Sequence, residues 1–246
     1  MAVAAGLLAA LVIGGALLPL LYFLQTVQKM SPISATLRLI PLMVAAAAFA
    51  PVAGDLTAKI GPRKVITAGL ALMAVGSSLL IWLAPETPYG QVLVALVLLG
   101  AGDIAVVTPV ADVILSAVPR ERTDSAAAVN GAAIQLGGAL GTALLTSVLL
   151  AVARAEYYQR LEPSGLSRQE ISAATEALRR SIQQGAESGG QAIPEAVRTQ
   201  LGDAYRQAFS MGAGGVFTCS AFICLLCAML VWFGLNKVSG KGSSPA

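Results

Sequence analysis

Residues 91–118 read QVLVALVLLGAGDIAVVTPVADVILSAV, a run of 28 residues in which only Asp103 and Asp112 carry a charge. A helix needs about 20 mostly apolar residues to cross the hydrocarbon core of a bilayer, which is about 30 Å thick. This stretch meets that requirement with residues to spare. It therefore predicts a chain that is built for a membrane rather than for water.

Five other stretches have the same character, and the composition of the whole chain agrees with them. Of 246 residues, 56% are hydrophobic and 12% are charged, whereas a soluble domain carries about 25% charged residues. The sequence therefore predicts an all-α integral membrane protein, a bundle of six transmembrane helices with short connections between the first five. The predicted spans cover residues 2–27, 33–53, 65–84, 91–118, 125–152 and 209–235.

A polar segment separates the fifth and sixth predicted spans. Residues 155–208 hold 13 of the 29 charged residues. Within them, Ser167 and Glu170 have the spacing of a helix-opening capping box, and Pro194 suits the first turn of a second helix. We expect a helical hairpin on the membrane surface, and we prefer a solvated cap to a dedicated binding site because its charges nearly cancel. The predicted organisation is 1–154 for helices one to five, 155–208 for the insert, 209–235 for helix six and 236–246 for a tail.

The residue types exclude most enzymatic sites. The chain has no histidine, so a Ser-His-Asp triad, a histidine-ligated zinc site and an imidazole proton relay are all excluded. The net charge of +3 is too small and too scattered to indicate a nucleic-acid partner. Cys224 and Cys227 lie in an apolar run, where small apolar fillers are commoner than a redox or metal pair. We therefore expect no enzyme, no cofactor and no metal site.

The basic residues predict the orientation in the membrane. An even number of spans places both termini on one side, and lysine and arginine accumulate in cytoplasmic loops. The short loops of the opposite side offer only Lys29 and Arg38. We therefore expect a multi-pass protein of the cell (inner or plasma) membrane, with both termini cytoplasmic and residues 155–208 outside. The basic residues on the side of the termini are Lys59, Arg63, Lys64, Arg120, Arg122, Lys237 and Lys241.

One connection carries a recognisable motif. Residues 54–64, between the second and third predicted spans, read GDLTAKIGPRK. They resemble the signature loop of the major facilitator superfamily, a family of secondary transporters. Because glycines allow a tight turn, we expect a cytoplasmic turn whose basic residues hold it on the inner face, and the resemblance implies a gating role for this loop. The family's acidic position is Ala58 here, and the matching positions are Gly54, Lys59, Gly61, Arg63 and Lys64.

The resemblance continues along nearly the whole chain. Further short motifs are similar to those of the fourteen-helix drug:proton antiporters, and their order and spacing together make the similarity specific. It implies proton-coupled efflux of small drug-like or cationic molecules. It also implies a fold of two six-helix bundles, of which this chain matches the C-terminal one. The motifs are Ser31-Pro32, residues 38–41, Thr108-Pro109 with Asp112, Val129-Asn130, and residues 135–141.

A single bundle forms only one wall of a substrate cavity. Besides the lipid bilayer, the small-molecule substrate and the proton, we therefore expect a second six-helix bundle as partner, either another copy of this chain in a homodimer or an N-terminal half. The alternative is a truncated or split transporter half that acts as an inactive membrane scaffold or partner subunit. It is suggested by a sequence that begins at Met1 with what matches the seventh or ninth helix of such transporters.

Two carboxylates occupy the fourth predicted span. Counted from Gln91 at about 1.5 Å per residue, Asp103 lies roughly 18 Å deep and Asp112 roughly 31 Å deep. A carboxylate at mid-depth is costly and often marks a proton path. We therefore expect Asp103 to exchange a proton and to bind a cationic substrate. The alternative is a protonated side chain that only packs, bonded to a neighbouring helix, for example through Gln135. We expect Asp112 to pair with a basic residue of 54–64 in the outward-facing state. The alternative is an interfacial Asp that reaches headgroup water.

Two amides and two glycines complete the candidate residues. We expect Gln25 and Gln135 to line the substrate site together with Asp103, although hydrogen bonding between helices is the simpler role for an amide in a span. Gly137 and Gly141 are four residues apart, a spacing that lets two membrane helices approach closely. For these glycines we prefer helix packing to a role in substrate passage.

Overall fold

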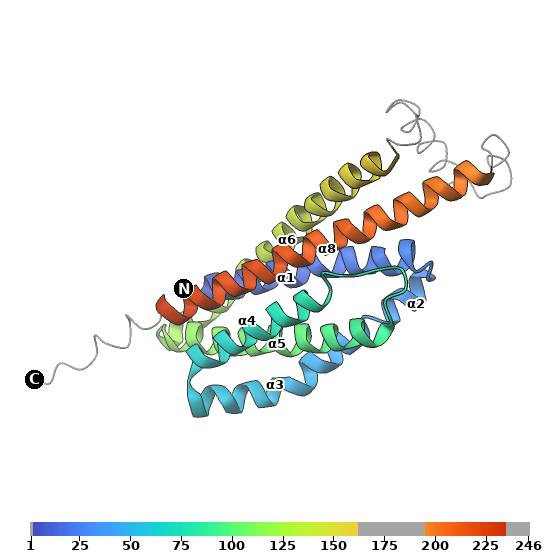
Figure 1. The fold of residues 1–246 in the computed structure, drawn as a ribbon. Coiled ribbons are helices and arrows are strands. Elements are labelled where there is room, and N and C mark those ends of the chain that lie inside the picture. Colours follow the sequence, from blue (N-terminus) through green and yellow to red (C-terminus); the bar gives the residue numbers. More distant parts are fainter. Residues whose placement is uncertain (1, 162–194, 235–246) are drawn as a thin grey trace, which may run out of the picture.

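The computed structural model describes residues 2–161 and 195–234. Within these ranges every regular element is a helix, and the helices form an elongated bundle (Figure 1). The prediction of an all-α membrane bundle is therefore confirmed. The start of α1 (Ala2–Tyr22) and the end of α8 (Glu195–Gly234) lie at the same end of this bundle. The chain thus runs along it an even number of times.

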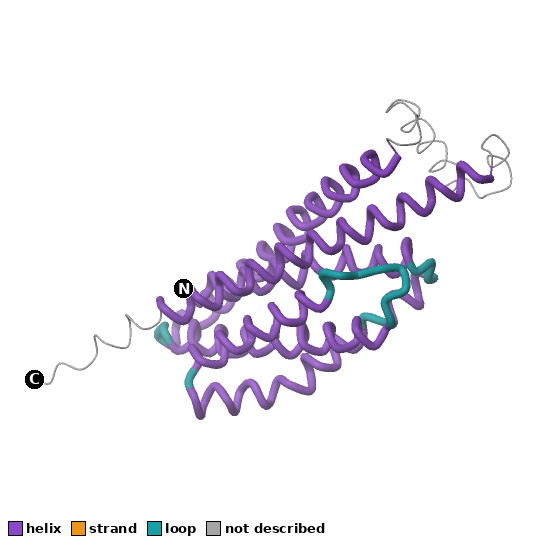
Figure 2. The backbone as a smooth tube through the Cα atoms, in the orientation of Figure 1, coloured by secondary structure: helices purple, strands orange, loops and turns teal. Residues whose placement is uncertain are grey.

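From α1 to α6 the long helices follow one another in alternating directions and are joined by short connections (Figure 2). The first helix, α1, continues without a break into the π-helical turn η1. Only two residues separate the short helix α2 from α3. In order, the elements are α1 (Ala2–Tyr22), η1 (Phe23–Val27), α2 (Pro32–Leu37), α3 (Ile40–Ile60), α4 (Pro62–Leu79), α5 (Tyr89–Ser116), the 3-10 turn η2 (Arg120–Arg122), α6 (Thr123–Leu161) and α8 (Glu195–Gly234).

Five of the described helical stretches are long and apolar enough to cross a membrane. They correspond to all the predicted spans except the third, which was expected over residues 65–84. Its helix, α4, has two basic residues in its first turn and ends earlier, at Leu79. At this end the side-chain amide of Gln91 donates a hydrogen bond of 2.6 Å to the Leu79 carbonyl. That bond satisfies an acceptor that a continuing helix would have used.

The turn between α3 and α4 is shorter than the sequence suggested. The loop expected over residues 54–64 is wrong, because α3 stays helical through Ile60 and α4 starts at Pro62. The change of direction falls on Gly61, whose φ of +86° is accessible to glycine at little cost. Pro62 follows at once and has no N–H with which to continue α3. Gly54 lies inside α3, where an added Cβ would meet no other atom within 4 Å.

The last two long helices extend further than the spans predicted for them. α6 has 39 residues and α8 has 40, which corresponds to about 58–60 Å of helix against about 40–45 Å for a bilayer with its headgroups. They run side by side and project beyond the other helices at the end away from the start of α1 (Figure 1). The first and last parts of segment 155–208 therefore belong to these helices. The capping box expected at Ser167 and the helix start expected at Pro194 lie outside the described residues.

Small residues bring α1 and α6 into backbone contact. The Thr142 hydroxyl donates a hydrogen bond of 3.1 Å to the Gly14 carbonyl of α1. Gly137 and Gly141 face the same helix, and a Cβ added at Gly141 would overlap the Leu11 carbonyl oxygen. The absence of side chains at these positions is what allows the two helices to lie so close.

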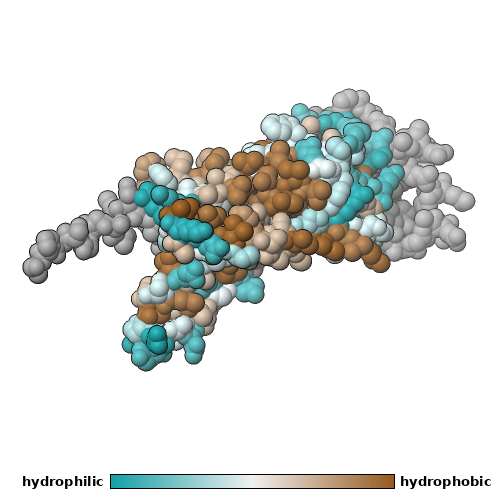
Figure 3. Space-filling model, turned by 90° about the horizontal axis from the view of Figure 1, so that it is seen from below, coloured by the Kyte–Doolittle hydropathy of each residue, from teal (hydrophilic) through white to brown (hydrophobic). Residues whose placement is uncertain are grey.

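An apolar core runs through the bundle, with α5 packed against α4, α3 and α1. Apolar side chains dominate the middle of the face seen in Figure 3, and hydrophilic ones gather toward its ends. This distribution is the one expected when the middle of the surface faces lipid and the ends face water. The largest fully buried side chains include Phe23, Leu70, Leu96, Leu99 and Phe217.

Candidate functional site

Asp103 occupies the buried stripe of α5. Two glycines of the same turn press their backbone against neighbouring helices. Gly100 faces the Leu42 carbonyl of α3, and a Cβ at Gly102 would lie 2.7 Å from the Gly69 carbonyl oxygen of α4. Because successive residues of a helix point about 100° apart, the Asp103 side chain leaves α5 on another side. That side carries the buried residues Leu96, Leu99, Val106 and Val110.

A group of α8 lies within electrostatic range of Asp103. The Asp103 carboxylate is close enough to the Cys224 thiol for an electrostatic interaction between them, and Cys224 is only 1% exposed. Among the residues that the structure describes, Asp103 forms no ion pair. The site is therefore a half-buried acid in apolar surroundings, without a fixed cation beside it. An ionised carboxylate without a partner is costly in such surroundings.

The structure separates the other two candidate lining residues from Asp103. Gln25 is half-buried and belongs to the π-helical turn η1, close to the end of the bundle where the first span finishes. Gln135 is exposed on α6, nearly opposite the face on which Gly137 contacts α1. No hydrogen bond joins Gln135 to Asp103. In this conformation Gln135 therefore does not bond the Asp103 carboxyl, and the alternative that Asp103 only packs against a neighbouring helix stays a prediction.

The basic signature stretch contacts the end of the last helix rather than α5. The guanidinium carbon of Arg63 lies 4.5 Å from the centre of the Trp232 ring, and the same group donates a hydrogen bond to the Trp232 carbonyl. Lys59 and Lys64 are exposed, as is Asp112. Across residues 2–161 and 195–234, Asp112 takes part in no ion pair. Its pairing in an outward-facing state stays a prediction.

Several polar groups of the interior were not predicted as part of a site. The hydroxyl oxygens of Ser77 in α4 and Ser220 in α8 are buried and have no hydrogen-bond partner among the described residues, and the same is true of the Asn130 side-chain oxygen in α6. The signal for them is weak, because a serine in an apolar run is compatible with a lipid-facing position. Trp232 could have been suspected as an aromatic residue at the basic end of the last span. Its partner Arg63 lies 169 positions away in the sequence.

Comparison with known proteins places these features in a family. The profile of the Major Facilitator Superfamily matches residues 1–154. The chain is 30% identical over 218 residues to the methyl viologen resistance protein SmvA of Salmonella typhimurium, covering 89% of this chain and 42% of that protein. It is 36% identical over 148 residues to the multidrug resistance protein Stp of Mycobacterium tuberculosis, covering 60% of this chain and 27% of Stp.

A third relative has a similar relation to the chain. The tetracenomycin C resistance and export protein of Streptomyces glaucescens is 28% identical over 219 residues, which is 89% of this chain and 40% of that protein. The chain thus spans about two fifths of the length of the relatives that it matches over most of its own length. The matched helices, the signature stretch and these relatives agree: the chain belongs to the Major Facilitator Superfamily, a family of membrane transporters rather than enzymes.

Proposed function

We propose that this chain is one six-helix half of a proton-coupled exporter of small drug-like or cationic molecules. The observation that carries the proposal is Asp103, a half-buried acid on the inner stripe of a membrane bundle without an ion-pair partner among the described residues. Acids in this position commonly mark proton or ion pathways. The names of the relatives, which refer to methyl viologen resistance and tetracenomycin C export, support the substrate class.

Proton coupling would follow from competition for this carboxylate. On the side of high proton activity Asp103 takes up a proton, and the neutral side chain has little attraction for a cation. When the site opens to the other side, the proton leaves and a cationic substrate binds the carboxylate in its place. Because the same carboxylate binds either the proton or the substrate, the export of the substrate is tied to the entry of the proton.

Transport would require a second bundle, and α3 and α6 are the helices that offer it a surface. Only 11% of the α3 span and 22% of the α6 span are buried, against 50% for the spans of α1 and α5. Gln135 is exposed on α6, and an amide that faces hydrocarbon is costly. A partner that covers this face would provide water or a hydrogen bond for Gln135. Such a partner would be a second copy of the chain or an N-terminal half. The greater length of the relatives favours the N-terminal half.

In the assembled transporter, the end of the bundle that holds Arg63 and Trp232 would face the cytoplasm, together with both termini. The exposed basic residues Lys59 and Lys64 lie at this end, in agreement with the accumulation of positive charge inside. In the outward-facing conformation Asp112 would pair with a basic residue of 59–64 and close this side. The same proposal assigns residues 1–154 to helices one to five, 155–208 to the polar insert outside the cell, 209–235 to helix six and 236–246 to the cytoplasmic tail.

A vesicle assay tests the proposal. Inside-out vesicles from bacteria that lack their own drug exporters are prepared with this chain alone, and with the chain and a co-expressed N-terminal six-helix half. Uptake of ethidium is then measured with and without a pH gradient. We expect gradient-driven uptake that falls at least tenfold in Asp103→Asn, while Asp124→Asn, which removes an exposed acid from the first turn of α6, stays within twofold of the parent.

The outcomes separate the alternatives. Gradient-driven uptake that survives unchanged in Asp103→Asn would make Asp103 structural and place proton coupling elsewhere. Uptake that appears only with the co-expressed half would identify the chain as a transporter half. Uptake in neither preparation, with folded chain present in the membrane, would favour the alternative of an inactive scaffold or partner subunit.

A further inference from the structure

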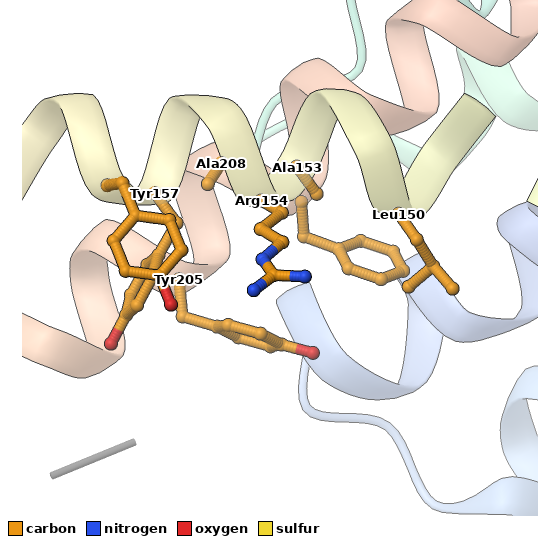
Figure 4. Close-up of a pocket in the computed structure, with 8 residues that line it drawn as sticks. Leu150, Ala153, Arg154, Tyr157, Tyr205 and Ala208 are labelled. Carbon is orange, nitrogen blue, oxygen red and sulfur yellow. The ribbon is translucent and has the colours of Figure 1, made fainter. Parts of the chain in front are cut away.

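A cavity lined by aromatic residues lies between α6 and α8, where these two helices extend past the others. It has a volume of about 240 Å³. Figure 4 shows that the Arg154 side chain extends from α6 toward Tyr205 of α8, with Tyr157 beside it. The complete lining is Leu150, Ala153, Arg154, Tyr157, Tyr158, Tyr205, Ala208 and Phe209.

The aromatic rings form a connected wall. The ring centres of Tyr157 and Tyr205, which belong to different helices, are 6.2 Å apart and nearly perpendicular, at 82°. Tyr205 continues the contact to Phe209 at 6.2 Å. Edge-to-face pairs of this kind contribute about 0.5–1.5 kcal/mol beyond the burial of their area. The Tyr157–Tyr205 contact therefore helps to hold α6 and α8 together at this wall.

Arg154 brings a positive charge without a carboxylate partner into this wall. Its guanidinium carbon lies 5.8 Å from the centre of the Tyr158 ring. Two other arginines at this end have acidic partners on their own helix, Arg160 with Glu156 at 3.1 Å and Arg206 with Asp203. Within the described part of the chain Arg154 forms no such ion pair, and the lining of the cavity contains no acidic residue. The cavity therefore attracts an anion and repels a cation.

The position of the cavity along the helices identifies the kind of anion. On α6, Arg154 is the first charged residue after Asp124, about 45 Å further along the helix, which is close to the thickness of a bilayer with its headgroups. On α8, Arg206 is the last charged residue before the apolar run that ends at Gly234. Both helices thus place the cavity in the headgroup layer next to the start of the apolar runs, where tyrosines are also enriched.

From this arrangement we propose that the cavity binds the headgroup of an anionic phospholipid, with phosphatidylglycerol as the test case. The phosphate accepts hydrogen bonds from Arg154, whose guanidinium matches phosphate geometry, and the start of an acyl chain lies along Leu150 and Phe209. Because no lining carboxylate is available for an ammonium group, phosphatidylglycerol binds more tightly than phosphatidylethanolamine. This inference depends on the membrane fold and is independent of transport activity.

Native mass spectrometry of the purified full chain in detergent provides the test. Phosphatidylglycerol, phosphatidylethanolamine and glycerol 3-phosphate are titrated separately. Arg154→Gln is compared with Arg206→Gln, which removes the same charge one residue from the Tyr205 wall, outside the lining of the cavity. We expect Arg154→Gln to weaken phosphatidylglycerol binding at least fivefold and Arg206→Gln to weaken it less than twofold. We also expect at least threefold weaker binding of phosphatidylethanolamine.

Several results would overturn the proposal. Equal losses in the two variants would show a general effect of surface charge, and glycerol 3-phosphate binding as tightly as the lipid would show a site for free phosphate rather than for lipid. A second measurement needs no variant: the parent protein is cross-linked to a photoactivatable phosphatidylglycerol and digested. Label on residues 150–158 and 205–209 would support the site, whereas label confined to other segments would refute it.

Discussion

Arg63 and Trp232 connect the beginning of α4 to the end of α8. The guanidinium carbon of Arg63 lies 4.5 Å from the centre of the indole ring, and the guanidinium group also donates a hydrogen bond to the Trp232 carbonyl. The contact begins two residues after the Gly61 turn, so it holds the junction of α3 and α4 against the last helix. The two residues are 169 positions apart, which makes this a long-range contact that closes one end of the bundle.

Replacing Trp232 should loosen that end. Trp232→Leu removes the ring and leaves the backbone carbonyl in place, so it tests the cation–π contact, which contributes about 0.5–2 kcal/mol depending on its exposure. We expect Trp232→Leu to have a lower midpoint of thermal unfolding in detergent than the parent protein. The midpoint is measured by size-exclusion chromatography of samples heated to increasing temperatures. Trp82→Leu is the matched control, because Trp82 is 77% exposed. Equal midpoints for the two variants would mean that the contact does not stabilise the bundle.

The contact between α1 and α6 should not tolerate even one methyl group at Gly141. A Cβ there would overlap the Leu11 carbonyl oxygen, whereas at Gly131 of the same helix it would meet nothing within 4 Å. We expect Gly141→Ala to destabilise the protein by about 1–3 kcal/mol. Gly131→Ala should be neutral or stabilising, because alanine is the better helix former by about 1 kcal/mol. Denaturant titration of both variants measures the difference, and a Gly141→Ala variant as stable as Gly131→Ala would show that the helices can separate freely.

The three cysteines should differ in their reactivity. Cys224 and Cys227 are 1% and 3% exposed, while Cys219 is only partly buried. A thiol must reach the reagent before it can react, so N-ethylmaleimide should modify Cys219 alone in the folded protein and all three cysteines in SDS. Peptide mass spectrometry reads the sites, and Cys219→Ala should abolish native labelling. Fast native labelling of Cys224 would show that the interior beside Asp103 opens often.

Impermeant thiol reagents can test the orientation. In a variant whose three cysteines are alanines, a cysteine in place of Ser188 should react with a reagent added outside intact cells, because the predicted insert lies outside. A cysteine in place of Ser243, in the predicted cytoplasmic tail, should react only after the cells are opened. The reverse pattern would place both termini outside and would assign the Arg63 end of the bundle to the external face.

The sequence predicted the elements of this fold better than their contacts. Apolar runs determine where helices must lie in a membrane, so the fold class and the approximate positions of the spans could be predicted. The end of α4 could not, because no local pattern shows that Gln91, twelve residues further along the chain, donates a hydrogen bond to the last carbonyl of this helix. The stretch from Gly54 to Ile60 looked like a loop by resemblance, yet nothing in it interrupts a helix before Gly61.

The candidate site shows the same division. The cost of an acid in a membrane singled out Asp103, but its neighbour Cys224 comes from a helix that is more than a hundred residues away in the sequence. The exposed position of Gln135 depends on which face of α6 packs against α1, and spacing alone predicts a close approach without naming the partner helix.

The projecting ends of α6 and α8 give this small bundle a feature for image alignment. About 58 Å of helix in a bilayer of about 40–45 Å leaves roughly 15 Å of paired helix outside a lipid nanodisc. A hydrogen bond from Arg160 to Gln207 joins the two helices there. A nanobody raised against this pair would therefore serve as a rigid fiducial for electron cryomicroscopy while leaving the α3 surface uncovered.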